Sequence, residues 1–145
     1  MTEQVNLRVA AENFAAMSAH DQARYAATLD EGFIWETDTL PAAITGPTMA
    51  QQAMAAYYAA FPDIHFDIER TVAEGPLIAI CWRAQGTQRG DLAGIPVTNR
   101  AIDLTGCSVF EIHNERIVHA WTYWDTGRML QQLGVLPGPA PADAG

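Results

Sequence analysis

The sequence predicts an α+β fold in which N-terminal helices pack on the inner face of a curved antiparallel sheet. Apolar residues at helical spacing dominate residues 5–61, and β-rich segments follow over residues 64–125. The last two β-rich segments are joined by Asn114-Glu115, the position of a tight hairpin turn. Helices followed by a run of strands favour segregated layers. A curved sheet with helices across its mouth would form a cone, lined by the inner face of the last hairpin.

Two helices are expected at the N-terminus, followed by a short strand. The first covers residues 5–18, where apolar side chains recur at helical spacing. The second begins after Asp21, a favoured N-cap residue, and turns Tyr25 and Leu29 inward. Residues 33–36 are then predicted to form a strand that enters the core.

A third helix is predicted to begin at Thr48 and to stop at Pro62. Thr48 and Gln51 have the spacing of a capping box, in which two side chains satisfy free backbone N–H groups at the helix start. Proline cannot continue a helix, so Pro62 ends it. The helix presents four large apolar or aromatic side chains, those of Met54, Tyr57, Tyr58 and Phe61.

Four strands are expected after this helix, over residues 64–73, 77–85, 101–112 and 117–125. The first alternates apolar and polar residues, which is typical of a half-buried strand. The second is nearly all apolar, which favours a central strand covered on both faces. The glycine-rich residues 86–96 between the second and third strands are predicted to be a loop.

The faces of the last strand follow from its alternation. One face would carry Ile117, His119, Trp121, Tyr123 and Asp125, and the other Val118, Ala120, Thr122 and Trp124. A two-residue turn would place Phe110 opposite His119, Ser108 opposite Trp121, and Gly106 opposite Tyr123. A single bulge would shift this register by one residue and exchange the two faces. Without a bulge, the first face lines the cone.

Asp125 is the leading candidate for a catalytic residue, because it stands where the last strand runs into a short helix over residues 129–134. A carboxyl among Trp121, Tyr123 and Leu104 would lose hydration, which raises its pKa and suits it to proton exchange beside a carbonyl. Aspartate is also a favoured N-cap residue. The residues alone leave both roles open.

His119 could polarise a substrate carbonyl or set the protonation of Asp125, although a lone histidine on a strand is more often a core or rim residue. No metal site is predicted, because His113 and His119 lie half a strand apart and no His-Glu-x-x-His helix exists. Cys81 and Cys107 match no metal or redox spacing and are expected to be free thiols. No cofactor is expected either.

Several aromatic residues could together line a flat, apolar ligand pocket. Taken singly, each is equally typical of an ordinary core, and only their convergence near Asp125 predicts a pocket. The candidate substrate-binding residues are Trp35, Tyr58, Trp82, Phe110, Trp121 and Tyr123. The opposite sheet face, with Val109 and Trp124, needs a cover that the helices cannot supply. We therefore expect a homodimer, or a tetramer built of dimers, that buries both residues between subunits.

The 145 residues suit a single domain over residues 1–137, followed by a disordered Pro-, Ala- and Gly-rich tail over residues 138–145. Asp and Glu number 17 against 8 Lys and Arg, for a formal net charge of −9. Such a chain repels phosphate backbones and anionic lipid, which argues against nucleic acid and membrane partners. With no apolar run of spanning length and no signal-peptide pattern, we expect a cytoplasmic protein.

Five short motifs occur in order along the chain: Phe61-Pro62-Asp63, Gly86-Thr87-Gln88-Arg89-Gly90, Gly94-Ile95-Pro96-Val97-Thr98, Trp121-x-x-x-Asp125 and Gln132-Leu133-Gly134. Together they resemble the SnoaL-like polyketide (ester) cyclase family, over roughly residues 9–136. The resemblance implies the nuclear-transport-factor-like cone fold. It also implies an enzyme without metal or cofactor that closes a ring by intramolecular aldol condensation, with Asp125 as acid/base.

Two positions depart from the family pattern: Gln88 replaces a frequent histidine, and Asn99 replaces a frequent glycine. Glutamine cannot exchange a proton, so any family chemistry that needs this histidine is in question. The leading hypothesis is a cyclase- or isomerase-type enzyme acting on an aromatic or polycyclic carbonyl compound by ring closure, isomerisation or hydration. A non-catalytic small-molecule-binding protein with the same pocket is the alternative. An assembly module that works through its sheet face is a third possibility.

Overall fold

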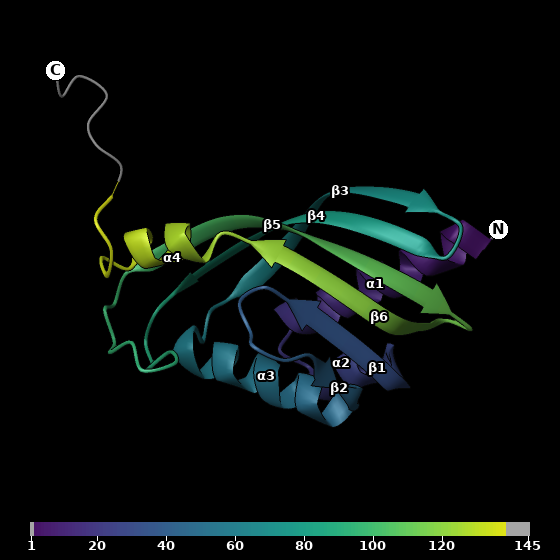
Figure 1. The fold of residues 1–145 in the computed structure, drawn as a ribbon, viewed down its shortest axis with the longest axis horizontal. Coiled ribbons are helices and arrows are strands. Elements are labelled where there is room, and N and C mark those ends of the chain that lie inside the picture. Colours follow the sequence, from purple (N-terminus) through teal and green to yellow (C-terminus); the bar gives the residue numbers. More distant parts are fainter. Residues whose placement is uncertain (1, 139–145) are drawn as a thin grey trace, which may run out of the picture.

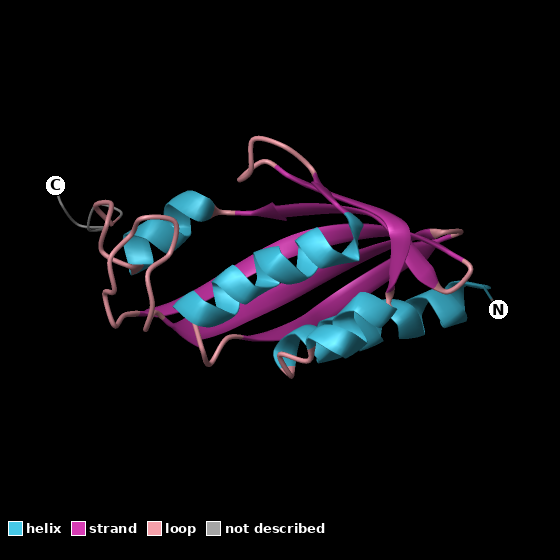
Figure 2. Ribbon diagram, turned by 90° about the horizontal axis from the view of Figure 1, so that it is seen from below, coloured by secondary structure: helices cyan, strands magenta, loops and turns pink. Residues whose placement is uncertain are grey.

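The computed structural model describes residues 2–138, in which a curved, unclosed six-stranded sheet carries the helices on one face (Figures 1 and 2). The α+β class with N-terminal helices on a curved sheet is therefore confirmed. The predicted tail lies almost wholly outside the described residues. The elements are α1 (Thr2–Ser18), α2 (Gln22–Ala27), β1 (Leu29–Thr37), β2 (Ile44–Thr45), α3 (Gly46–Ala60), β3 (His65–Glu74), β4 (Leu77–Thr87), β5 (Ala101–His113), β6 (Arg116–Trp124) and α4 (Thr126–Gln132).

The strand order in the sheet is β2-β1-β6-β5-β4-β3. Neighbouring strands are antiparallel, as predicted, except β1 and β6, which pair in parallel. The chain between β1 and β6 includes α3 and three long strands, and a connection of that length permits a parallel pair. Helix α1 packs against β3, and α3 packs against β1. The two long helices thus lie toward opposite edges of the same sheet face.

The helix starts agree with the sequence in one case and differ in another. Asp21 caps α2, and its side chain accepts a hydrogen bond of 3.1 Å from the backbone N–H of Arg24. The capping box predicted at Thr48 is wrong, because α3 begins two residues earlier at Gly46. Pro47 occupies the first turn of α3, where its fixed φ suits a helix and its missing N–H costs no hydrogen bond.

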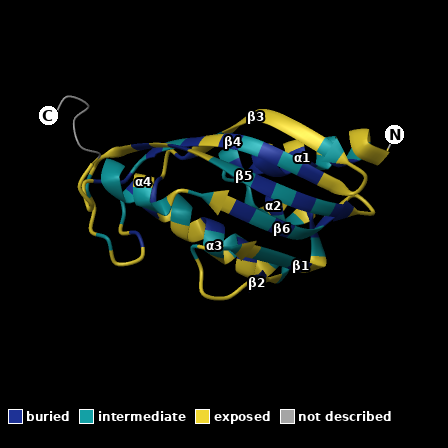
Figure 3. Ribbon diagram, turned by 45° about the horizontal axis from the view of Figure 1, so that its top comes forward, coloured by how far each residue is buried: buried dark blue, intermediate teal, exposed yellow. Residues whose placement is uncertain are grey.

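Burial differs sharply between the strands (Figure 3). Strand β4 lies between β5 and β3 and alternates buried and accessible residues, so its predicted cover on both faces is wrong. Strand β3 lies at the sheet edge and is mostly exposed. Ile68 and Val72 are exposed, so the predicted half-buried character of β3 is wrong. A register shift between Ile68 and Arg70 breaks the alternation that the sequence suggested. Within residues 2–138, no helix combines the length and the apolar character needed to cross a membrane.

The β5–β6 hairpin turns at Asn114-Glu115, as predicted, and both residues have positive φ, which suits a tight two-residue turn. An irregularity next to the turn then changes the register: Ile112 pairs with Ile117, but Glu111 pairs with His119. Beyond it, the cross-strand pairs are Phe110 with Ala120, Ser108 with Thr122, and Gly106 with Trp124. The predicted register is therefore wrong by one residue, and the two faces of β6 are exchanged beyond the bulge.

Candidate functional site

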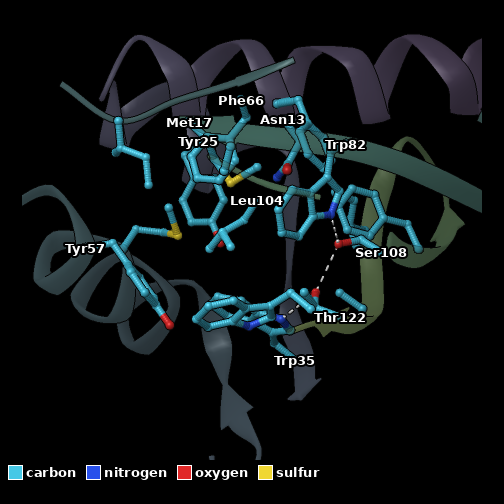
Figure 4. Close-up of a pocket in the computed structure, with 18 of the residues that line it drawn as sticks. Asn13, Met17, Tyr25, Trp35, Tyr57, Phe66, Trp82, Leu104, Ser108 and Thr122 are labelled. Carbon is cyan, nitrogen blue, oxygen red and sulfur yellow. Dashed lines mark hydrogen bonds between the residues drawn. The ribbon is translucent and has the colours of Figure 1, made fainter. Parts of the chain in front are cut away.

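A cavity of about 100 Å³ lies between the helices and the inner face of the sheet (Figure 4). One water molecule needs roughly 10–15 Å³ on the same measure, so the cavity has room for a small organic molecule. Most of its lining is aromatic or aliphatic, from α1 to α4 and from the long strands. Among the lining residues that the structure describes there is no Asp, Glu, His, Lys, Arg or Cys. The exceptions to its apolar character are Asn13, Ser108, Thr122 and the polar ends of tyrosine and tryptophan rings.

Three of the six aromatic residues predicted to bind substrate do line this cavity, namely Trp35, Trp82 and Phe110. Their role as ligand contacts stays a prediction. Tyr58 lies elsewhere, because its hydroxyl donates to the backbone oxygen of Met17 at 3.0 Å and its ring stacks on His20.

Trp121 and Tyr123 face away from the cavity, contrary to expectation, because of the register shift in β6. Tyr123 is 52% exposed, and Trp121 stacks on His119 with ring centroids 3.9 Å apart. His119 therefore also lies on the outer face, where its Nε2 is hydrogen-bonded to the Glu36 carboxylate. Neither the histidine nor its carboxylate partner lines the cavity.

Asp125 is exposed and caps helix α4. Its Oδ1 accepts a hydrogen bond of 2.9 Å from the backbone N–H of Arg128. The predicted desolvation of this carboxyl among aromatic rings is wrong, and Asp125 does not line the cavity. The reason is again the bulge, which turns Trp121 and Tyr123 outward and brings Trp124 inward. A catalytic role for Asp125 stays a prediction.

Trp124 lines the cavity, with its ring centroid 6.5 Å from that of Tyr57. Its predicted place on the uncovered sheet face is therefore wrong, and its burial between two subunits stays a prediction. Val109 does lie on the outer face, opposite Trp121. A homodimer that covers this face stays a prediction, and sedimentation equilibrium at micromolar concentration would test it: a clean monomer would contradict it.

A chain of hydrogen bonds crosses one wall of the cavity and was not predicted from the sequence (Figure 4). Trp82 Nε1 donates to Ser108 Oγ at 3.0 Å, and Trp35 Nε1 donates to Thr122 Oγ1 at 3.0 Å. The two hydroxyl oxygens lie 3.1 Å apart and share one further hydrogen bond. Sequence reasoning missed both hydroxyls, because the bulge-free register placed Thr122 outside and set Ser108 opposite Trp121.

Small residues beside the two tryptophans make this chain possible. Trp82 pairs with Gly106, where an added Cβ would lie 2.3 Å from the indole, so only glycine lets the ring reach across β5 to Ser108. Trp35 pairs with Ala120 in the same way and reaches Thr122, two residues further along β6. A tryptophan opposite a small residue, with a hydroxyl two positions on, is the signal that could have found the site.

Two tyrosines add hydroxyl groups to the cavity lining, and burial raises the pKa of both Tyr25 and Tyr57. Both phenols therefore stay protonated at physiological pH. They can donate hydrogen bonds to a ligand, but they do not act as bases there.

In the motif at residues 86–90, Gln88 has a structural role. Gln88 is fully buried; its Nε2 donates to the backbone oxygens of Gly90, Ile95 and Pro96, and its Oε1 accepts from Thr98. This amide ties a loop together and does not line the cavity. The other departure from the family pattern, Asn99 in place of glycine, is explained by the backbone. Asn99 has a φ of 59°, a conformation that asparagine tolerates better than most residues.

Comparison with known proteins agrees with this geometry. The family model of the SnoaL-like polyketide cyclases matches residues 8–133. The chain belongs to the SnoaL-like polyketide cyclase family. Its cone is the one seen in ketosteroid isomerase-like and NTF2-like proteins, as the resemblance implied. No curated protein matches the chain.

Solved structures of similar fold share little sequence with this SnoaL-like protein. A protein from Jannaschia sp. CCS1, described as a SnoaL-like polyketide cyclase, has a TM-score of 0.85 and 19% identity, covering 94% of this chain and 96% of its own. AclR from Streptomyces galilaeus, described as a hydroxylase, has a TM-score of 0.84 and 17% identity, covering 95% and 86%. IdmH from Streptomyces antibioticus, described as a polyketide cyclase, has a TM-score of 0.79 and 24% identity, covering 90% and 99%.

Proposed function

We propose that this SnoaL-like protein encloses a small, neutral aromatic or polycyclic carbonyl compound in its cavity and holds it folded for intramolecular ring closure. The observation that carries the proposal is a cavity walled by apolar and aromatic side chains, without a charged group among the described lining residues. Such a wall favours a neutral, flat molecule, because burying an unpaired charge there would be costly. Family membership supports cyclase-type chemistry.

The absence of acidic and imidazole groups from the described lining bears on mechanism. A rate gain would come from holding the reacting atoms close together, which can replace much of the entropy cost of ring closure. Asp125 could act as acid or base only for a part of the ligand that extends to the outer end of β6. The same observation favours the second candidate function, a non-catalytic binding protein that uses this cavity.

A titration with indane, followed by the indole N–H resonances of the cavity tryptophans, tests the proposal. Indane is a flat, neutral hydrocarbon and needs only the apolar wall. Ala84 lines the cavity, so Ala84→Leu should fill part of it and weaken binding roughly tenfold or more. Ala79 lies on the same strand but on the opposite face, so Ala79→Leu is the matched control and should bind as the wild type does. Equal binding by both variants, or no binding to the wild type, would contradict the proposal.

A further inference from the structure

The two hydroxyls in the cavity wall have one more proton than their own network uses. Ser108 is 4% exposed and Thr122 is 9% exposed, and each accepts a hydrogen bond from one indole N–H. Between the two oxygens there is one hydrogen bond, which uses one of the two hydroxyl protons. Among the described residues, no acceptor is found for the second proton in either arrangement.

The same count of protons and lone pairs shows which hydrogen bonds the two hydroxyls can still make with a ligand. If Ser108 donates to Thr122, the Thr122 oxygen has both lone pairs occupied and its proton is free; in the reverse arrangement, the Ser108 proton is free. In each case the pair presents one donor and one acceptor site within a mostly apolar wall. The two indole N–H groups are already engaged, so they do not compete for the same acceptor.

We infer that Ser108 and Thr122 form the hydrogen-bonding site for a carbonyl oxygen of the ligand. A neutral carbonyl is the fitting acceptor, because the wall around it lacks a cation that would balance an anionic oxygen. This inference rests on the proposed function, since it needs a ligand in the cavity.

The hydrogen bond would also set the orientation of the ligand. Ser108 and Thr122 are directly paired on β5 and β6, the two strands that cross the middle of the sheet. Gly106 and Ala120 leave room for the indoles, and each indole N–H donates to one of the two hydroxyl oxygens. The donor is therefore held by four strands before a ligand arrives, which reduces the entropy lost on binding.

Two probes that differ in a single group test the inference. 1-Indanone and indane share a bicyclic skeleton, and a carbonyl in the former replaces a methylene in the latter. With 1-indanone labelled with ¹³C at the carbonyl, we expect a bound resonance downfield of its position in cyclohexane, as hydrogen bonding requires. The contribution of the carbonyl to affinity is measured by the ratio of the indane dissociation constant to the indanone dissociation constant.

The double variant Ser108→Cys/Thr122→Val removes both hydroxyl donors. The cysteine sulfur and the valine methyl still fill the space that the two hydroxyl oxygens occupy beside the indole N–H groups. A thiol is a weak donor, so the affinity ratio should fall roughly threefold to tenfold and the downfield shift should be lost. Each single variant keeps one hydroxyl proton and should lose only part of the ratio. Thr105→Val, on the exposed face of β5, is the matched control and should change neither readout.

The outcomes separate this inference from the proposed function. If indane and indanone both bind but the double variant keeps the wild-type ratio and shift, the hydroxyl pair is not the carbonyl site, although the cavity still binds ligands. If neither probe binds, the proposed function fails and the inference fails with it. Should the double variant not fold, the wild-type resonance decides: a carbonyl shift equal to that in cyclohexane overturns the inference.

Discussion

The two faces of the central sheet carry the same kinds of residue but use them differently. On the inner face, Trp35 and Trp82 lie in the cavity wall with each indole N–H bonded to a buried hydroxyl. On the outer face, Trp121 stacks on a histidine that pairs with an exposed carboxylate, and Tyr123 is half exposed. Residue type alone therefore does not reveal which sheet face lines the cavity. The register of one hairpin decides it.

The largest expected contrast between the faces concerns stability. Ile80 is fully buried on the inner face of β4, and Leu77 is 41% exposed at the start of the same strand. Ile80→Ala should lower the free energy of unfolding by about 2–5 kcal/mol, through lost burial and a new cavity. Leu77→Ala removes a similar side chain from an accessible position and should cost at most about 1 kcal/mol. Urea denaturation measures both, and equal losses would contradict the assignment of faces.

A smaller effect is expected from Gly106→Ala, which would place a Cβ 2.3 Å from the Trp82 ring. Overpacking of this kind costs about 1–3 kcal/mol, and the ring should also move away from Ser108. In a Trp82→Leu background the clash is removed, so the same glycine substitution should be nearly neutral. A double-mutant cycle by urea denaturation measures this coupling. Additive losses would show that the indole does not lie across Gly106.

A still smaller loss of stability is expected from substitutions at Asp125, at the outer end of β6. Asp125→Ala removes the cap of α4 and should lower the free energy of unfolding by about 1 kcal/mol. Asp125→Asn keeps an acceptor oxygen and should lower it by only a few tenths of a kcal/mol. Thermal denaturation measures both. Affinity for indane should stay at the wild-type value in both variants, since Asp125 does not line the cavity. Loss of turnover on an identified substrate in Asp125→Asn, with folding intact, would instead support the acid/base role.

The smallest effect concerns pH, because the hydroxyls and indoles of the inner-face network do not titrate in the usual range, whereas exposed carboxylates do. The backbone N–H of Thr87 donates to Asp63 Oδ1 at 2.7 Å and lowers the pKa of Asp63 below its usual 3.8. A lowered pKa means that this stabilisation is present above about pH 4 and is lost as pH falls through the lower folded value. Below about pH 4, the unfolding midpoint of Asp63→Asn should therefore fall less steeply with pH than that of the wild type. The same fall in both proteins would contradict the prediction.

Much of the fold was predictable because its signals are local. Helical spacing indicated α1, the Asp21 cap marked the start of α2, and Asn114-Glu115 marked the hairpin turn. The family motifs were also readable, although Gln88 in one of them ties a loop together through its buried amide and does not line the cavity. Local chemistry fixes caps and turns, since the groups involved are only a few residues apart.

The α+β class, the order of the elements and the presence of an aromatic-rich sheet face could be predicted from the sequence. Which residues face the cavity depends on tertiary packing. The bulge next to the β5–β6 turn moved Thr122 and Trp124 inward and left Trp121 and Asp125 outside. Side chains on a strand alternate with a period of two, so one extra residue reverses every later assignment. Whether a strand holds such a residue depends on its packing against its neighbours, which no local pattern in the chain records.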